Sequence, residues 1–251
     1  MNMFDLSGKI AVVTGANKGL GKGIAVGLAK AGADIVAVHR SDVSSVKQEI
    51  EALGRRFAAV HADLSDIDRV KQVIPEAVEA FKRIDILVNN AGMIKRKPAV
   101  DYTEDEWDSV IDVNLKALFL LSQAAARQFI RQESGGKIIN IASMLSYQGG
   151  ILVPSYTSSK TAVLGLTRAL ANEWAAHNIN VNGIAPGYMV TDNTENLRKD
   201  KDRYESITAR IPSGRWGTPE DLQGAAIFLA SEASEYMQGF TIAIDGGWLA
   251  R

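Results

Sequence analysis

The chain has 251 residues, of which 46% are hydrophobic and 23% charged, so it can bury one substantial core. Its 28 Lys and Arg residues balance 29 Asp and Glu residues, which leaves no excess positive charge to attract nucleic acid or an anionic membrane. The lack of cysteine excludes disulfides and thiol nucleophiles, and the three histidines show no metal-binding spacing, so we expect no metal site.

The ends and apolar runs of the chain predict no membrane segment. Residues 1–9 are polar and contain no apolar signal core. The longest uncharged run, 138–159, is long enough to cross a bilayer, but it includes Asn140, Gln148 and several serines. We therefore expect a cytoplasmic protein without a membrane or nucleic-acid partner.

Short apolar runs alternate with longer amphipathic stretches along the chain. Strands are predicted at 9–14, 34–38, 56–60, 84–88, 137–141, 179–185 and 241–244. Helices are predicted at 20–31, 43–53, 67–81, 104–131, 155–176 and 219–230. Strands that are apolar almost throughout are typical of a parallel sheet covered on both faces. The alternation predicts a single α/β domain over residues 1–251, a doubly wound sheet in three layers, with a polar insertion at 191–210 as a substrate lid.

A glycine-rich segment, 14–21, follows the first predicted strand and opens the first helix. Glycines at this place permit a tight turn and let the backbone approach a pyrophosphate at the helix N-terminus. A Walker A motif is excluded, because Gly23 stands where Ser or Thr is required. The segment predicts dinucleotide binding, although glycines can also simply punctuate a strand-to-helix turn. The loop residues expected to contact the cofactor are Gly15, Asn17, Lys18, Gly19 and Leu20.

The end of the second strand predicts which nicotinamide cofactor is used. An acidic residue there would bind the ribose hydroxyls of NAD(H), but the strand runs into His39, Arg40 and Ser41. Arg40 is a planar cation suited to a 2′-phosphate, and Lys18 in the glycine loop can reach the same group. These two cations favour NADP(H). The alternative is that Arg40 stacks on adenine and Lys18 is solvated.

Tyr156 and Lys160 are four residues apart at the start of a predicted helix, so they share one helical face. A lysine ammonium beneath the ring would lower the tyrosine pKa and suit it to general acid–base catalysis. Ser143, after the fifth strand, would orient a substrate carbonyl toward Tyr156. Asn114 is a polar residue in an apolar helix, with a structural or water-binding task. Singly, these residues could be a surface helix pair, a helix-capping serine and a buried structural amide.

Together the motifs resemble the short-chain dehydrogenase/reductase family over essentially the full chain and in the family's order. Further matches are Asp63 after the third strand, 89–92 after the fourth, 186–191 after the sixth and 245–247 near the C-terminus. The resemblance implies a Rossmann-type fold, NAD(H) or NADP(H) as cofactor, hydride transfer to a carbonyl and a homotetramer. No G-x-S-x-G motif surrounds a serine, which argues against an α/β-hydrolase.

The resemblance also implies roles for individual residues. Ser143 would hold the substrate carbonyl oxygen and Tyr156 would donate the proton. Lys160 would orient the cofactor ribose, and Asn114 would hold a water that feeds protons to Lys160. Asp63 would contact the adenine. The other cofactor contacts would come from Leu64, Asn90, Ala91, Gly92, Pro186, Gly187, Met189 and Thr191.

The substrate loops are similar to those of one subgroup, which acts on sugar acids of pectin and uronate breakdown. The similarity lies at 92–96, 136–146, 148–150, 171–174, 211–217 and 245–251. A sugar acid carries a carboxylate, which a guanidinium binds through two hydrogen bonds, so Arg96 and Arg215 are candidate ligands beside Gln148. Both arginines could equally be solvated cations or interface pairs. The subgroup is regarded as NAD-linked, which conflicts with the preference indicated by Lys18 and Arg40.

Two other functions fit the sequence. A related reductase acting on gluconate or on carrier-bound 3-oxoacyl groups would keep the same motifs. A carrier-protein partner would favour a basic docking patch, and the run at 95–97 is too short to decide. A non-catalytic nucleotide-binding regulator would keep the fold but would have no need for a proton relay.

Overall fold

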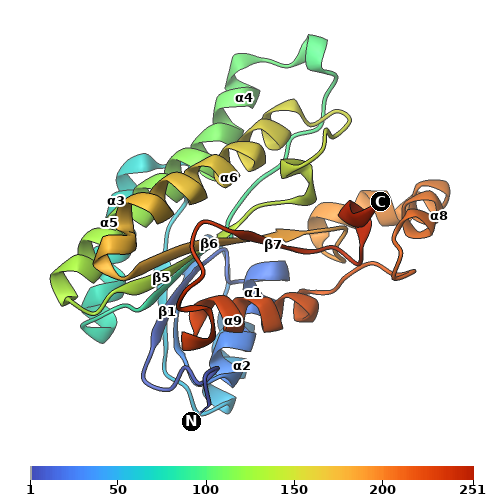
Figure 1. The fold of residues 1–251 in the computed structure, drawn as a ribbon. Coiled ribbons are helices and arrows are strands. Elements are labelled where there is room, and N and C mark those ends of the chain that lie inside the picture. Colours follow the sequence, from blue (N-terminus) through green and yellow to red (C-terminus); the bar gives the residue numbers. More distant parts are fainter. Residues whose placement is uncertain (1) are drawn as a thin grey trace.

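A parallel sheet of seven strands forms the centre of the computed structural model, which describes residues 2–251 (Figure 1). The strands are β1 (Ile10–Thr14), β2 (Asp34–His39), β3 (Phe57–His61), β4 (Ile86–Asn89), β5 (Gly136–Ile141), β6 (Ile179–Pro186) and β7 (Thr241–Ile244). Their order across the sheet is β3-β2-β1-β4-β5-β6-β7. The chain reverses direction across the sheet between β1 and β4, and ligands of doubly wound sheets bind at such a switch point.

Helices cover both faces of the sheet (Figure 1). One layer consists of α1 (Gly19–Lys30), α2 (Ser44–Ala52) and α9 (Gln223–Ala230), and the other of α3 (Ile67–Phe81), α4 (Glu104–Ile111), α5 (Ala117–Gln132) and α6 (Pro154–Trp174). Two short helices, α7 (Glu195–Lys199) and α8 (Lys201–Arg210), follow β6 outside these layers. The predicted doubly wound, three-layer fold is confirmed.

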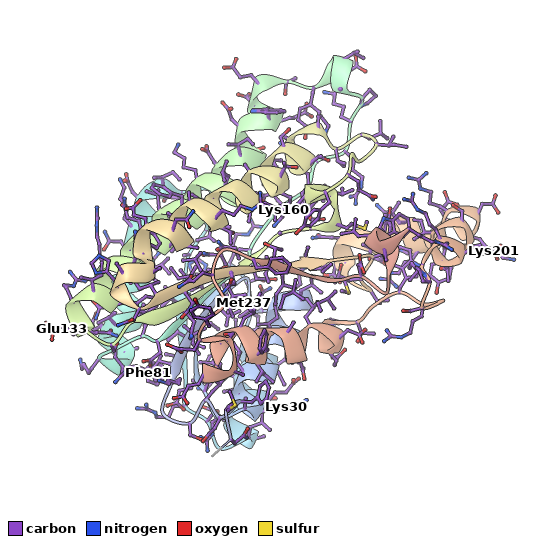
Figure 2. The ribbon with its side chains drawn as sticks, viewed as in Figure 1. Lys30, Phe81, Glu133, Lys160, Lys201 and Met237 are labelled. Atoms are coloured by element: carbon purple, nitrogen blue, oxygen red, sulfur yellow. The ribbon has the colours of Figure 1, made fainter. Side chains whose placement is uncertain are left out.

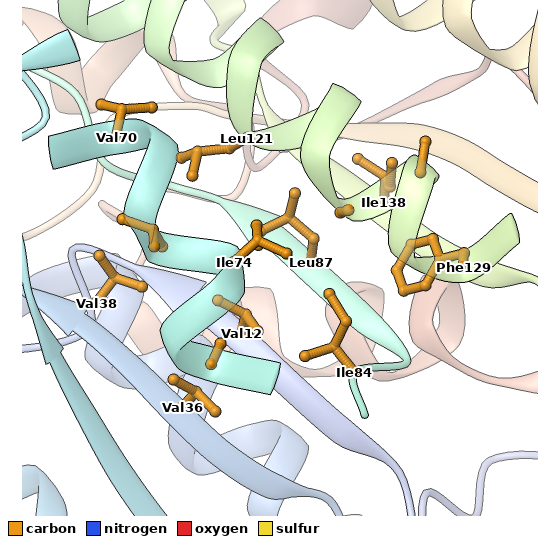
Figure 3. Close-up of a cluster of buried hydrophobic side chains, with 14 of the residues drawn as sticks. Val12, Val36, Val38, Val70, Ile74, Ile84, Leu87, Leu121, Phe129 and Ile138 are labelled. Carbon is orange, nitrogen blue, oxygen red and sulfur yellow. The ribbon is translucent and has the colours of Figure 1, made fainter. Parts of the chain in front are cut away.

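The core lies on both faces of the sheet because successive strand residues point to opposite helical layers. Val12 packs toward α3 and α5, in the cluster that also contains the fully buried Phe129 (Figure 3). The next residue, Val13, packs with α1 and α9 on the other face. The apolar strands therefore hold both layers, as expected for a parallel sheet.

The predicted helix 104–131 is interrupted in the structure. It consists of α4 and α5 joined by a π-helical turn at Asp112–Lys116. By length and composition the whole stretch, Glu104–Gln132, could cross a membrane. Its apolar residues Leu121, Ala125 and Phe129 are instead part of the core between the helices and the sheet. This stretch is a core helix of the fold.

The polar insertion at 191–210 is largely helical. Asp200 caps α8, because its carboxylate accepts a hydrogen bond from the Arg203 N–H at 3.0 Å. Ile207, on the inner side of α8, is buried in an aromatic cluster with Trp216 and Trp248. The insertion therefore packs on a small apolar cluster that is separate from the two cores on the faces of the sheet.

The C-terminal segment packs against the end of α8. The Arg210 guanidinium lies 4.0 Å above the Trp248 ring centroid. The Arg251 side chain donates to the carbonyls of Ala209 and Arg210, at 3.1 and 2.8 Å. These carbonyls end a helix and have no partner within it, so Arg251 caps α8 from the far end of the chain.

Candidate active site

The glycine loop after β1 is folded tightly against the start of α1. Gly15 and Gly19 have positive φ values of 65° and 54°, which glycine adopts without strain. A Cβ on Gly21 would lie 2.2 Å from the Gly15 carbonyl oxygen, so a larger residue there would push α1 off the loop. Lys18 is the N-cap of α1, and within residues 2–251 no side chain caps this helix end. Uncapped N–H groups and the helix dipole suit a phosphate, so the loop fits a dinucleotide pyrophosphate.

Thr14, the last residue of β1, joins this loop to the segment that follows β4. Its hydroxyl oxygen accepts hydrogen bonds from the backbone N–H groups of Asn90 and Ala91, each at 2.9 Å. The Asn90 side-chain amide donates to the Thr14 carbonyl at 2.8 Å. This role of Thr14 was not among the predictions. The available signal was a hydroxyl residue at the last position of an otherwise apolar strand.

Arg40 and Asp63 meet where β2 and β3 end. Arg40 Nη1 lies 3.3 Å from Asp63 Oδ2, and both side chains are exposed. The other Asp63 oxygen accepts hydrogen bonds from the Ser65 backbone and hydroxyl, which lower the Asp63 pKa. The Asn17 amide donates to the Ser41 hydroxyl at 2.8 Å and so joins the glycine loop to the end of β2. These residues border the region expected to hold the adenosine end of the cofactor.

The other predicted cofactor contacts lie along the same edge of the sheet. Thr191 is beside the glycine loop, since a Cβ on Gly19 would lie 3.8 Å from Thr191 Cγ2. Met189 is buried and pairs through a β-bridge with Gly217. The topology therefore delivers to one edge the residues Leu20, Leu64, Ala91, Gly92, Pro186, Gly187, Met189 and Thr191.

Tyr156 and Lys160 lie on the first turns of α6, and Ser143 follows β5. Lys160 Nζ is 5.8 Å from the Tyr156 ring centroid and donates to the Ile141 carbonyl at 2.6 Å. Figure 2 shows Lys160 on the side of α6 that faces the sheet. The Ser143 hydroxyl lowers the pKa of Tyr156, and its oxygen accepts a hydrogen bond from the Leu145 N–H at 3.1 Å. Ser143 is therefore a helix cap that also acts on the tyrosine.

Burial is the largest influence on the pKa values of Tyr156 and Lys160. It raises the pKa of Tyr156, and the opposing effects of Ser143 and Arg96 are smaller. It also lowers the pKa of Lys160 to about 8. For Tyr156 the desolvation cost of the phenolate outweighs the surrounding charges, and the lowering of its pKa by Lys160 stays a prediction.

Asn114 lies in the π turn and is fully buried. Its Oδ1 accepts from the Met93 N–H at 2.8 Å, and its Nδ2 donates to the Met93 carbonyl at 2.9 Å and to the Ser159 hydroxyl at 3.1 Å. A Cβ on Gly92 would lie 3.2 Å from Asn114 Oδ1 and 3.7 Å from Lys160 Nζ, so Asn114 lies near Lys160. Both amide hydrogens of Asn114 have protein partners, whereas its Oδ1 can accept a second hydrogen bond, so the implied water-binding role stays a prediction.

The three predicted substrate residues lie in different surroundings. Both terminal nitrogens of Arg215 bind the Asp221 carboxylate, at 2.7 and 2.8 Å, in a structural ion pair. Gln148 lines a surface hollow of about 490 Å³ beside β7 and the C-terminal tail. Arg96 donates to the Asn193 carbonyl at 3.3 Å, and its charge lowers the Tyr156 pKa. Of these three residues, Arg96 is the one whose charge acts on Tyr156.

The fold and this constellation define an oxidoreductase that uses a nicotinamide cofactor. Residues 15–249 match a family model described as enoyl-(acyl carrier protein) reductase. The whole chain is 59% identical to the 2-dehydro-3-deoxy-D-gluconate 5-dehydrogenase of Dickeya dadantii (strain 3937) and 57% identical to that of Escherichia coli (strain K12), covering 99% of each. A crystal structure with bound NADP from Agrobacterium tumefaciens, assigned as a 2-deoxy-D-gluconate 3-dehydrogenase, has a TM-score of 0.92 at 51% identity, with full coverage of both chains. The chain belongs to the short-chain dehydrogenase/reductase family and is an NAD(P)-dependent enzyme.

The Tyr156→Phe variant is expected to lose turnover while keeping its cofactor affinity. Removing one hydroxyl leaves the ring packing intact but deletes the proton donor, which costs a factor of about 10²–10⁴ in rate. Initial rates measure the loss, and a fluorescence titration with NADPH checks the affinity. Near-normal turnover would contradict the assignment of Tyr156.

The pH dependence should report on Lys160. Tyr156 has a raised pKa and stays protonated through neutral pH, whereas Lys160, with a pKa of about 8, loses its charge above that value. We expect kcat for carbonyl reduction to fall as the pH rises through about 8. The Lys160→Met variant, which cannot titrate, should have a lower rate without this fall. A wild-type profile that is flat through this region would contradict the expectation.

Proposed function

We propose that the protein interconverts 2-dehydro-3-deoxy-D-gluconate and its 2,5-diketo form, 3-deoxy-D-glycero-2,5-hexodiulosonate. The observation that carries the proposal is the position of Arg96, whose charge acts on Tyr156, while Arg215 is held by Asp221. A cation whose charge lowers the Tyr156 pKa suits a substrate that carries a carboxylate near the reacting carbonyl. The names of the relatives described above support the same substrate.

The proposed substrate holds its carboxylate at a short distance from the reacting carbonyl. In the diketo acid the C1 carboxylate and the C5 carbonyl are four carbon–carbon bonds apart, about 5 Å in an extended chain. The Asn193 carbonyl takes one of the five N–H donors of Arg96. The guanidinium can therefore turn a pair of parallel donors toward C1 while C5 faces Tyr156.

Each catalytic side chain then has one task. The Ser143 hydroxyl holds the C5 oxygen within reach of the Tyr156 hydroxyl, which gives its proton during reduction and takes one during oxidation. Lys160, charged below about pH 8, stabilises the phenolate left by proton transfer and holds the cofactor ribose. The nicotinamide, when bound, supplies or accepts the hydride, so reduction adds one hydride and one proton to the carbonyl.

The two cations near the adenosine region favour NADP(H), but a carboxylate lies beside each of them. Arg40 contacts Asp63, and Lys18 contacts Asp192 at 2.6 Å. Each carboxylate offsets part of the positive charge that would attract a 2′-phosphate. This balance supports the use of both NAD(H) and NADP(H).

The organisation of the protein in solution is a further part of the proposal. We propose that the insertion at 191–210 acts as the substrate lid and that the enzyme works in the cytoplasm as a homotetramer, the assembly that the family resemblance implies. The exposed position of α7 and α8 beyond β6 supports a lid (Figure 1). Light scattering that gave the mass of a single chain would refute the tetramer.

The substrate assignment is tested by initial rates of NADH and NADPH oxidation with the 2,5-diketo-3-deoxy acid. Turnover with either coenzyme is the expected result, because Arg96 and the catalytic residues suit a carboxylate near the carbonyl. 5-Ketogluconate and a 3-oxoacyl thioester are the matched comparison substrates. Faster turnover of either comparison substrate would favour a related reductase, and coenzyme binding without any turnover would favour a regulator.

The Arg96→Gln variant is expected to raise KM for the diketo acid by about ten- to hundredfold with a smaller change in kcat. The variant loses a charge-assisted hydrogen bond to the substrate, which is worth about 1.5–3 kcal/mol. Arg215→Gln is the matched control, since its guanidinium is already paired with Asp221. An increase in KM in Arg215→Gln but not in Arg96→Gln would reverse the assignment.

A further inference from the structure

An ion pair bridges the glycine loop and the insertion at 191–210. Lys18 Nζ lies 2.6 Å from Asp192 Oδ2. Lys18 is the N-cap of α1, at the proposed phosphate-binding end, and Asp192 opens a short helical turn directly after Thr191. The partners are 174 positions apart in the chain, so the pair forms only because β1 and β6 deliver both segments to one edge of the sheet.

The backbone that carries Asp192 is held on both sides. The Thr194 hydroxyl donates to the Met189 carbonyl at 2.6 Å and accepts from the Thr191 N–H at 3.2 Å. Arg198 donates to the Thr191 carbonyl at 3.1 Å. These bonds present the Asp192 carboxylate to the glycine loop from an ordered turn.

We propose that Asp192 sets the coenzyme preference by competing with the 2′-phosphate of NADP(H) for Lys18. This inference rests on the proposed assignment of Lys18 and Arg40 to that phosphate. Arg40 lies at the end of β2 and Asp192 follows β6, and β1, β4 and β5 separate these two strands in the sheet. One ammonium cannot pair fully with anions at both places. NADP(H) must therefore draw Lys18 away from Asp192, whereas NAD(H) leaves the pair intact.

Asp63, which pairs with Arg40, does not compete with the 2′-phosphate in the same way. It meets Arg40 through a single atom pair at 3.3 Å, and its other oxygen is bound by Ser65. Asp63 is also expected to contact the adenine that both coenzymes share, so its replacement would weaken both. The Asp192 carboxylate has Lys18 as its hydrogen-bonded cation, so its replacement should act on NADP(H) alone.

The test is the Asp192→Asn variant, which removes the charge and keeps the side-chain size. Dissociation constants for NADPH and NADH are measured on the full chain by fluorescence titration at low salt. Exposed ion pairs are weak, so we expect the NADPH constant to fall by about two- to fivefold and the NADH constant to stay unchanged. The fall should diminish as salt screens the charges.

Glu195→Gln is the matched control. It removes one negative charge from the same insertion, but Glu195 pairs with Lys199 at 2.7 Å and not with the glycine loop. Both coenzyme constants should stay unchanged in this variant. An equal gain in NADPH affinity in Glu195→Gln would show that the change in affinity comes from the net charge of the insertion, and it would overturn the proposal.

A double-mutant cycle identifies Lys18 as the shared partner. Lys18→Met should weaken NADPH binding selectively, and adding Asp192→Asn to that variant should give no recovery. The proposal is overturned if Asp192→Asn changes both coenzymes equally, if its effect persists without Lys18, or if Lys18→Met spares NADPH. The readout needs no sugar acid, so inactivity toward the diketo acid would refute the substrate assignment and leave this test intact.

Discussion

The active site depends on the hydrogen bonds that join the end of β1 to the end of β4. Thr14 receives the N–H groups of Asn90 and Ala91, and its carbonyl receives the Asn90 amide. Gly21 packs on the same junction, because a Cβ there would lie 2.5 Å from Asn90 Nδ2. The chain leads from this junction to α1 on one side and toward Arg96 on the other. Ligands of doubly wound sheets bind at the switch point between β1 and β4. These bonds hold the segments that follow the two strands in one geometry.

Two further sets of contacts connect this junction to the proposed catalytic and substrate-binding residues. Asn114 binds the Met93 backbone and the Ser159 hydroxyl, so the segment after β4, the π turn and α6 are held together. The insertion makes the second connection, since Asp192 pairs with Lys18 and the Asn193 carbonyl accepts from Arg96. Two adjacent residues of one turn, Asp192 and Asn193, therefore contact the proposed coenzyme-binding cation, Lys18, and the proposed substrate-binding cation, Arg96.

Local sequence patterns predicted most of the framework. The predicted strands and the helices other than 104–131 have ends within two residues of those observed, apart from a 3-10 turn that opens the 219–230 segment, because apolar runs and helical periodicity are local signals. The spacing of Tyr156 and Lys160 was also sufficient to predict that both lie on one face of α6, since residues four apart on a helix share a face. The helix 104–131 was predicted without its π turn, which arises where Asn114 meets Met93, a partner outside the helix.

The sequence by itself determined the fold class and predicted the glycine loop and the candidate catalytic residues, because each is encoded in residue types at short spacing. Only the tertiary structure decided which group each charged side chain acts on. Arg215 became a structural pair with Asp221, whereas Arg96 came to act on Tyr156. Burial came to dominate the Tyr156 pKa. These outcomes depend on distances between segments remote in the chain and on exclusion of water, and neither quantity is written in a local pattern.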